Sequence, residues 1–230
     1  MMPALNVRVV ELLCSRLCHD LVSPVGAISN GMELIEEARV ETGEGIAGND
    51  SDMLGEALDL IALSASQAAR RLTLFRFAYG TAGTLARDFG EARRAAEGWL
   101  RGGRTSLDWD ANQPPPSLAG RLGIMKMLMN LIVLADECLP QGGVVHVSGS
   151  GNAEVGMLRV SASGPALRLL AETRDTLQAP LVEPETLTPR TIHAFITRCF
   201  AAHYAMHLRP LMLDDSGTRM TAEVVWQTAP

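Results

Sequence analysis

The stretch Leu17-Cys18-His19-Asp20-Leu21-Val22-Ser23-Pro24 lies near the start of a long segment whose apolar residues have helical spacing. On a helix that advances about 100° per residue, one side of this segment is apolar. Its members are Val10, Leu13, Leu17, Leu21, Ile28 and Ile35. His19 lies about half a turn away, on a side made of small and polar residues: Ser15, Arg16, Ser23, Gly26, Asn30, Glu33 and Glu37. The spacing predicts an imidazole that faces solvent.

Three neighbours distinguish His19 from an ordinary surface histidine, which in most proteins is inert. Asp20 follows immediately and can orient or polarise the ring. Ser23 lies four residues later, one helical turn away on the same side. Pro24 removes a backbone donor and bends the helix. We therefore take His19, Asp20 and Ser23 as the candidate catalytic residues.

The composition is that of an acidic globular protein. Of the 230 residues, 47% are hydrophobic and 4% aromatic, which favours a helix-rich fold built as one large domain or two small ones. The net charge of -6 and the pI near 5.4 disfavour nonspecific binding of nucleic acid, because such binding needs a basic surface that displaces counterions. We expect no nucleic-acid partner.

Nothing near the N-terminus indicates export. The residues from Met1 to Arg8 lack the basic, apolar and cleavage regions of a signal peptide. The most apolar run, Leu122 to Ala135, contains Lys126 and Asn130 and is shorter than the roughly 20 residues that span a bilayer. We expect a cytoplasmic protein with no membrane segment and with reduced cysteines, namely Cys14, Cys18, Cys138 and Cys199.

The N-terminal third of the sequence predicts two long helices and one loop. Helical spacing covers Leu5 to Arg39, and Glu41 to Asp50 is rich in glycine and acidic residues without a period. Ser51 is the expected N-cap of the second helix. Steps of four and three then form a coiled-coil seam through Leu54, Leu58, Ile61, Ala65, Ala68, Leu72, Phe75 and Tyr79. The two helices are expected to form an antiparallel hairpin.

Such a hairpin can bury each apolar seam only in part. The usual solution is a second copy that completes a four-helix bundle, so we expect a homodimer. The alternative is a hairpin that packs on the C-terminal half of its own chain.

The C-terminal half predicts a mixture of helices and strands after a short hinge at Thr81 to Thr84. Helices are expected near 85–100, 117–138, 166–174 and 191–204, and strands near 105–109, 144–148, 157–162, 207–213 and 219–226. The fold class is therefore α+β. We expect a helical hairpin at residues 1–81 and, at residues 82–230, a domain whose helices cover one face of a sheet.

The run from His19 to Pro24 resembles the H-box of sensor histidine kinases, which reads His, acid, Leu, any residue, Thr or Asn, and Pro. Ser23 stands where that family usually has Thr or Asn. A helical hairpin followed by an α/β sandwich is also the order of a histidine kinase catalytic core. The resemblance implies that His19 is a phosphoacceptor and that the second domain has the fold of an ATP-binding domain.

The kinase motifs that bind ATP are present here only as remnants. The stretch Asn130 to Gly143 resembles the N-box, but the asparagine that holds magnesium falls on Leu134. The D-x-G-x-G loop has Ala162 in place of its adenine-binding acid and Ala166 in place of its last glycine. Thr188 to His193 occupies the place of the Gly-rich loop. Phosphoryl transfer from ATP depends on positioning and metal-assisted charge neutralisation, so we expect no ATP binding and no kinase activity.

An intact H-box beside a degenerate ATP site resembles the ChpT family of histidine phosphotransferases, over nearly the whole chain. The resemblance implies a homodimeric four-helix bundle flanked by two domains that do not bind ATP. It also implies a cell-cycle phosphorelay between receiver domains, in which the hybrid kinase CckA supplies the phosphoryl group and CtrA and CpdR accept it.

The expected mechanism begins with a ring nitrogen of neutral His19 attacking an aspartyl phosphate on a receiver. Imidazole suits this step because it titrates near neutrality. Asp20 is expected to accept a hydrogen bond from the other ring nitrogen or a neighbouring group. Magnesium would come from the receiver, so this chain itself would bind no metal and no cofactor. The expected docking surface consists of Ser15, Arg16, Val22, Ser23 and Gly26, with Arg16 also able to meet phosphate charge.

Two other patterns suggest different chemistry. Cys14, Cys18 and His19 form C-x3-C-H, one residue longer than the haem-attachment motif, inside a continuous helical pattern and without an export signal. Cys199, His203 and His207 repeat every four residues like metal ligands on a helix, but the helical signal ends before His207. We expect neither a haem nor a metal site.

Two alternative functions remain open at this point. One is an active histidine kinase with a divergent ATP site, and the other is a protein that binds receivers without transferring phosphate. Nucleotide binding distinguishes the first from a phosphotransferase, and labelling by a phosphorylated receiver distinguishes the second.

Overall fold

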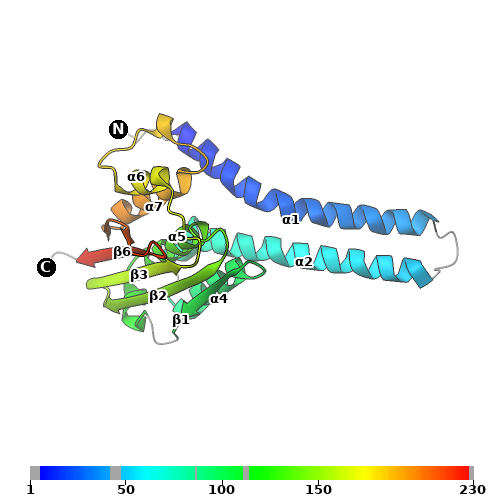
Figure 1. Cartoon of the computed structure of the whole chain (residues 1–230), viewed down its shortest axis with the longest axis horizontal. Helices are drawn as coiled ribbons and strands as arrows, with labels where there is room; N and C mark the ends of the chain where they lie inside the picture. Colours follow the sequence, from blue (N-terminus) through cyan, green and yellow to red (C-terminus); the bar gives the residue numbers. More distant parts are fainter. Residues whose placement is uncertain (1–5, 42–47, 86, 111–113, 228–230) are drawn as a thin grey trace. The chain divides into compact units, whose positions relative to one another are not determined.

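The computed structural model describes residues 6–41, 48–85, 87–110 and 114–227 (Figure 1). Two long helices come first, α1 (Val7–Glu41) and α2 (Gly48–Ala78), followed by the short α3 (Ala82–Leu85). The remaining elements are α4 (Phe89–Leu100), β1 (Thr105–Trp109), η1 (Pro116–Gly120), α5 (Ile124–Glu137), β2 (Gly143–Gly151), β3 (Val155–Ser163), α6 (Ala171–Gln178), η2 (Pro184–Thr186), α7 (Ile192–His203), β4 (His207–Leu208), β5 (Met212–Leu213) and β6 (Arg219–Gln227). This order confirms the predicted α+β class.

The chain divides into two compact units. One is Ser15–Thr73, which contains most of α1 and α2, and the other combines Met1–Cys14 with Leu74–Pro230. The expected domains, residues 1–81 and 82–230, stay a prediction, because these units are defined by packing alone.

In the first unit, α1 and α2 form the predicted antiparallel hairpin. Pro24, Gly31 and Ala38 are buried at intervals of seven residues along α1, and Ala57 and Ser64 are buried along α2. The helices meet closely at Gly31, where an added Cβ atom would lie 2.6 Å from Cγ1 of Ile61 and 3.3 Å from the carbonyl oxygen of Ala57. Small residues therefore let the two backbones approach.

The structure corrects two predictions about α2. This helix begins at Gly48, so Ser51 lies inside it and is not its N-cap. The predicted seam is also not the buried stripe, because Leu58 and Leu72 are 53% and 50% exposed, whereas Ala57 and Ser64, which lie outside the seam, are buried. The hairpin thus buries one stripe of α2 and leaves a second apolar stripe in solvent.

The second unit is built on a six-stranded sheet with the order β1-β2-β3-β6-β4, in which β5 also pairs with β6. β1 and β2 are parallel, and the other pairs are antiparallel. The turn between β2 and β3 uses Gly151 at a φ of 97°, and the Asn152 side chain accepts hydrogen bonds from the backbone N–H groups of Glu154 and Val155.

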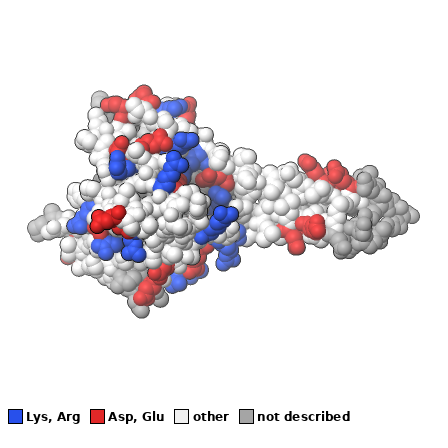
Figure 2. Space-filling model, viewed as in Figure 1, with Lys and Arg blue, Asp and Glu red and all other residues white. Residues whose placement is uncertain are grey.

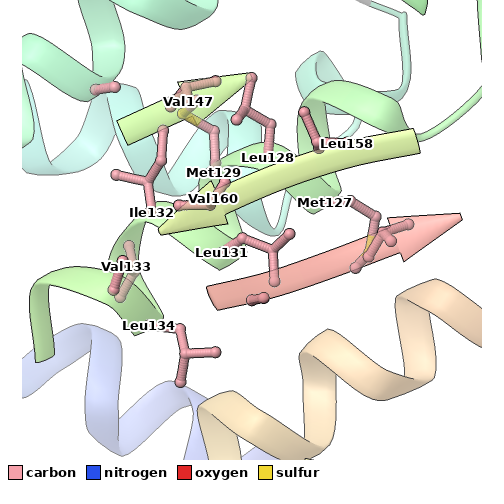
Figure 3. Close-up of a cluster of buried hydrophobic side chains, with 14 of the residues drawn as sticks. Met127, Leu128, Met129, Leu131, Ile132, Val133, Leu134, Val147, Leu158 and Val160 are labelled. Atoms are coloured by element: carbon pink, nitrogen blue, oxygen red, sulfur yellow. The ribbon is translucent and has the colours of Figure 1, made fainter. Parts of the chain in front are cut away.

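The core lies between α5 and one face of this sheet. Figure 3 shows Met127, Leu128 and Leu131 of α5 packed toward Val147, Leu158 and Val160 of the strands, and all six are at most 4% exposed. Twelve residues of α5 are buried, because protein encloses this helix on every side. This enclosure explains why its apolar residues are not confined to one face. In the described part of the chain, no helix has both the length and the apolar character needed to cross a bilayer.

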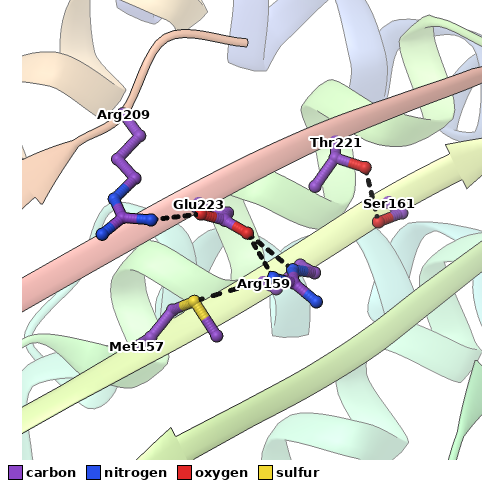
Figure 4. Close-up of polar contacts among 6 residues, drawn as sticks. All are labelled: Met157, Arg159, Ser161, Arg209, Thr221 and Glu223. Carbon is purple, nitrogen blue, oxygen red and sulfur yellow. Dashed lines mark hydrogen bonds and ion pairs between the residues drawn. The ribbon is translucent and has the colours of Figure 1, made fainter. Parts of the chain in front are cut away.

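The other face of the sheet carries polar side chains, as the two-residue period of strands requires. Glu223 of β6 is 3% exposed and accepts hydrogen bonds from Arg159 and Arg209 at 2.7 and 3.0 Å (Figure 4). Ser161 of β3 and Thr221 of β6 are hydrogen-bonded to each other at 3.0 Å on the same face. These contacts join neighbouring strands on this face.

Several element boundaries in the second unit differ from the predictions. The expected hinge at Thr81 to Thr84 is mostly helical, because α3 begins at Ala82. The expected helix at 117–138 is divided into η1 and α5 by Gly123, whose φ is 78°. A Cβ atom on Gly123 would collide with the ring of Tyr204. The expected strand at 207–213 is divided into β4 and β5, with Pro210 between them. The helix expected at 166–174 is found as α6, five residues later.

Candidate functional site

His19 lies on α1 with its side chain in solvent. The side chain is 87% exposed, and Nδ1 lies 3.3 Å from Oδ1 of Asp20, whose own side chain is 19% exposed. Asp20 is the one hydrogen-bonding partner of this ring among the described residues. The imidazole is therefore accessible and held at one nitrogen.

The contact with Asp20 indicates which nitrogen of His19 carries the proton in the neutral ring. A carboxylate only accepts hydrogen bonds, so Nδ1 carries the proton in the neutral ring. Nε2 then has a lone pair and no described partner. The geometry supplies a nucleophile at Nε2 and an orienting carboxylate at Nδ1.

The helix is unusual one turn after His19. Ser23 is exposed, and Pro24 is buried inside an α1 that continues to Glu41. Because proline has no N–H, the backbone carbonyl of Asp20 lacks the helical donor that residue 24 would normally provide. A backbone acceptor is thus left without its helical partner at Asp20, the residue next to His19.

The other residues predicted to form the docking surface lie on the same stretch of α1. Ser15 and Gly26 are exposed, and Val22 is 67% exposed. A Cβ atom on Gly26 would meet nothing within 4 Å, so the backbone there is open to close approach. Arg16 is half-buried. Val25, which the sequence analysis did not single out, adds a second apolar side chain that is 51% exposed.

The antiparallel register of the hairpin adds two basic residues that sequence analysis missed. Gly31 of α1 lies opposite Ala57 and Ile61 of α2, so His19 is level with residues 69–73. This range contains Arg70 and Arg71, both half-buried. The Arg70 guanidinium donates a hydrogen bond to Oγ of Ser66 at 2.5 Å. Sequence analysis could not find these two arginines, because their closeness to the level of His19 depends on the register between the helices and not on spacing along one helix.

The charged side chains of the hairpin are sorted along its length. The described acidic residues toward the connecting loop are Glu33, Glu36, Glu37, Glu56 and Asp59, and Figure 2 shows acidic side chains next to the undescribed end of the hairpin. Among the residues of the first unit whose side chains are described, the arginines are Arg16, Arg70 and Arg71, and they lie toward the level of His19. Among these described side chains, positive charge therefore lies nearer the histidine and most of the negative charge lies nearer the loop.

The positions that would bind ATP in a kinase lie inside the core or lack polar groups. Leu134 is 1% exposed and Ala162 is 0% exposed, and both belong to the main hydrophobic cluster. Ala166 is half-buried in the segment before α6. None of these three side chains can ligate a metal or accept a hydrogen bond from adenine.

The polar residues nearest to those positions hold the end of α2. The Asn130 amide donates to the carbonyl of Ala78 at 2.9 Å. His193 is fully buried, and its Nε2 lies 2.9 Å from the carbonyl oxygen of Asn130 and therefore donates to it. Nδ1 then accepts from the Tyr79 hydroxyl at 2.9 Å. Asn130, the remaining N-box asparagine, is thus a structural residue that fixes the last turn of α2.

The haem and metal alternatives have no geometric support in the described residues. Cys14 and Cys18 are exposed on an uninterrupted α1. Cys199 and His203 lie on α7, whereas His207 begins β4, so the three do not share one helical face. No three His, Cys, Asp or Glu side chains in the described ranges lie close enough together to hold a metal ion.

Comparisons with known proteins find a family model and relatives that are similar to this chain. Residues 89–215, more than half of the chain, match the model of the histidine phosphotransferase C-terminal domain family. The chain is 29% identical over 199 residues to the protein phosphotransferase ChpT of Brucella abortus (strain 2308), covering 86% of this chain and 87% of the relative. It is also similar to a bacterial phosphotransferase of known structure, with 26% identity, a TM-score of 0.71, and coverage of 96% of this chain and 98% of the other.

Proposed function

Because this chain belongs to the histidine phosphotransferase family and is a protein phosphotransferase, we propose that His19 is the residue that carries the phosphoryl group. The group comes from the aspartyl phosphate of one receiver domain and passes to the aspartate of a second. The observation that carries this proposal is the 87% exposed His19 side chain whose Nδ1 lies against Asp20.

The transfer consists of two displacements at phosphorus. In the first, the Nε2 lone pair of neutral His19 forms a P–N bond while the bond from phosphorus to the aspartyl oxygen breaks, which releases a carboxylate. In the second, a carboxylate oxygen of the second receiver attacks phosphorus, and the P–N electron pair returns to Nε2. Asp20 holds the proton on Nδ1 throughout and stabilises the positive charge that develops on the ring.

The receiver docks on the exposed surface around His19. Val22 and Val25 supply apolar area, Gly26 permits close approach, and Ser15 and Ser23 supply hydroxyl groups. Arg16, with Arg70 and Arg71 at the same level of α2, favours the negatively charged phosphoryl group. The Mg²⁺ ion that such transfers use is bound by the receiver, so this chain binds no cofactor of its own.

The functional unit is a homodimer. Its support is the second apolar stripe of the hairpin, which includes Met32 of α1 and Leu58 and Leu72 of α2, each between 48% and 53% exposed. A second hairpin on this stripe would complete a four-helix bundle. Replacement of Leu58 and Leu72 by Glu is expected to give a monomer in sedimentation, whereas a dimer with unchanged affinity would contradict this assembly.

The phosphorelay is of the type in which CckA is the donor and CtrA and CpdR are the acceptors. The similarity to ChpT supports this assignment. The chain itself does not use ATP, because core side chains occupy the positions of the metal-binding asparagine and the adenine-binding acid.

Phosphorylation by a receiver tests the function. Incubation with a ³²P-phosphorylated receiver should label the wild-type chain in an acid-labile, alkali-stable form and should leave His19→Gln unlabelled. ATP with Mg²⁺ should produce neither labelling nor a thermal shift. Labelling by ATP would favour the kinase alternative, and binding of the receiver without label would favour a non-catalytic binding protein.

A further inference from the structure

Lys126 is the only lysine in the sequence, and every other basic residue is an arginine or a histidine. Its side chain is almost completely buried in the first half of α5, with the residue 2% exposed. Lysine is rarely buried unless its ammonium group is paired, because desolvation of the charge is costly. The position of this residue therefore needs a physical explanation.

The described contacts of Lys126 leave its charge without an anionic partner. Nζ donates a hydrogen bond to the backbone carbonyl of Gly80 at 2.6 Å and lies 4.5 Å from the centre of the Phe200 ring. An ammonium group has three N–H donors, so one carbonyl and one aromatic face do not satisfy it. Burial also lowers the pKa of Lys126 to about 8, and no neighbouring carboxylate opposes this change.

Lys126 lies in the wall of an open cavity of about 510 Å³ in the second unit. The walls come from the turn after α2, from α3 and from the C-terminal part of α7: Tyr79, Gly80, Thr81, Thr84, Cys199, Phe200, His203 and Tyr204. Tyr79, Phe200 and Tyr204 contribute aromatic rings to this lining, and it contains no Asp or Glu. The titratable groups that face Lys126 there are Tyr79, Cys199, His203 and Tyr204.

We propose that this cavity binds a small aromatic carboxylate, whose anionic group accepts hydrogen bonds from Nζ of Lys126 and whose ring packs against Phe200 and Tyr204. The carboxylate provides the missing charge partner in an environment of low polarity, where a charge-assisted hydrogen bond is strong. The aromatic walls favour a planar apolar body. Thr84 and Tyr204, hydrogen-bonded to each other at 2.8 Å, border the cavity at α3.

The unique lysine makes the proposal directly testable by NMR, with 2-naphthoate as the probe. Protein grown with [ε-¹³C]lysine gives one lysine signal, so binding of the probe elsewhere, including on the exposed apolar stripe of the hairpin, is not read as binding at this cavity. At pH 7 we expect 2-naphthoate to shift this signal saturably, with a dissociation constant below about 1 mM. The pKa of Lys126 should rise from about 8 toward its ordinary value of 10.5 when the probe is bound.

Two controls separate carboxylate recognition from general apolar binding. The neutral analogue 2-naphthalenemethanol should bind at least tenfold more weakly, and so should 2-naphthoate at pH 10, where Lys126 is neutral. Cys199→Trp, which fills the cavity from the exposed Cys199 while leaving Lys126 in place, should abolish the shift. The proposal is overturned if 2-naphthoate leaves the lysine signal unchanged, if the alcohol binds equally well, or if Cys199→Trp responds like the wild-type protein.

Discussion

The carboxylate of Asp20 lies 3.3 Å from Nδ1 of the adjacent His19, and both side chains belong to one turn of α1. This contact joins a largely shielded acid to an accessible base. It leaves Nε2 as the unprotonated nitrogen.

Asp20→Asn should slow phosphorylation of His19 without unfolding the hairpin. The amide keeps the size of the carboxylate but loses the charge that stabilises the ring as phosphorus is attacked. We expect a decrease of about 10²-fold in the transfer rate from a phosphorylated receiver, measured by rapid quench. A rate equal to that of the wild-type protein would remove Asp20 from the mechanism.

Arg70→Ala should weaken the productive complex with a phosphorylated receiver. Arg70 is level with His19 and contributes positive charge where the phosphoryl group arrives, so transfer should slow and depend less on salt. Arg70→Lys keeps the charge and serves as the matched control. If alanine and lysine variants transfer at the same rate and with the same salt dependence, the charge at this position has no role.

Gly31→Ala should destabilise the hairpin, whereas Gly55→Ala should stabilise it. An added Cβ atom meets Ile61 at 2.6 Å in the first case and nothing within 4 Å in the second. Alanine replaces glycine favourably in an exposed helix by about 1 kcal/mol, which is the expected gain for Gly55→Ala. Urea unfolding of the two variants should therefore give opposite signs, and equal effects would contradict the close approach at Gly31.

The stability of the wild-type protein should rise relative to Lys126→Met as the pH increases from 7 to 10. Burial lowers the pKa of Lys126 to about 8 from 10.5, so between these values the unfolded chain binds a proton that the folded chain does not. Stability then increases with pH in this window, by about 3 kcal/mol at most. Unfolding free energies of both proteins at several pH values measure the difference. A constant difference would mean that the pKa of Lys126 is not lowered.

The sequence was sufficient for the features that depend on local patterns. The exposed His19, the hairpin and the apolar α5 follow from periodicity and from the run His19 to Pro24. Features that depend on tertiary packing were missed. Leu58 and Leu72 belong to a regular three-four seam that predicts burial, and only the observed packing of α1 against α2 shows that they face solvent.

The dependence on tertiary packing also explains which features of the second unit could not be predicted from the sequence. Asn130 occupies a motif position that suggests nucleotide binding, but its amide is used to hold the carbonyl of Ala78. In the sequence, Lys126 is only an interruption of an apolar run, because its burial beside Gly80 and Phe200 depends on residues far away in the sequence. Gly123 divides a predicted helix because the ring of Tyr204 occupies the space of a side chain.

Identification of the phosphorylated atom tests the central claim most directly. The wild-type chain, incubated with a phosphorylated receiver and digested, should yield one phosphopeptide containing His19, and NMR of the intact protein should show phosphorus on Nε2. His19→Gln should retain the circular dichroism of the wild-type protein and carry no phosphate. Phosphorylation at another residue, or transfer between receivers by His19→Gln, would contradict the account.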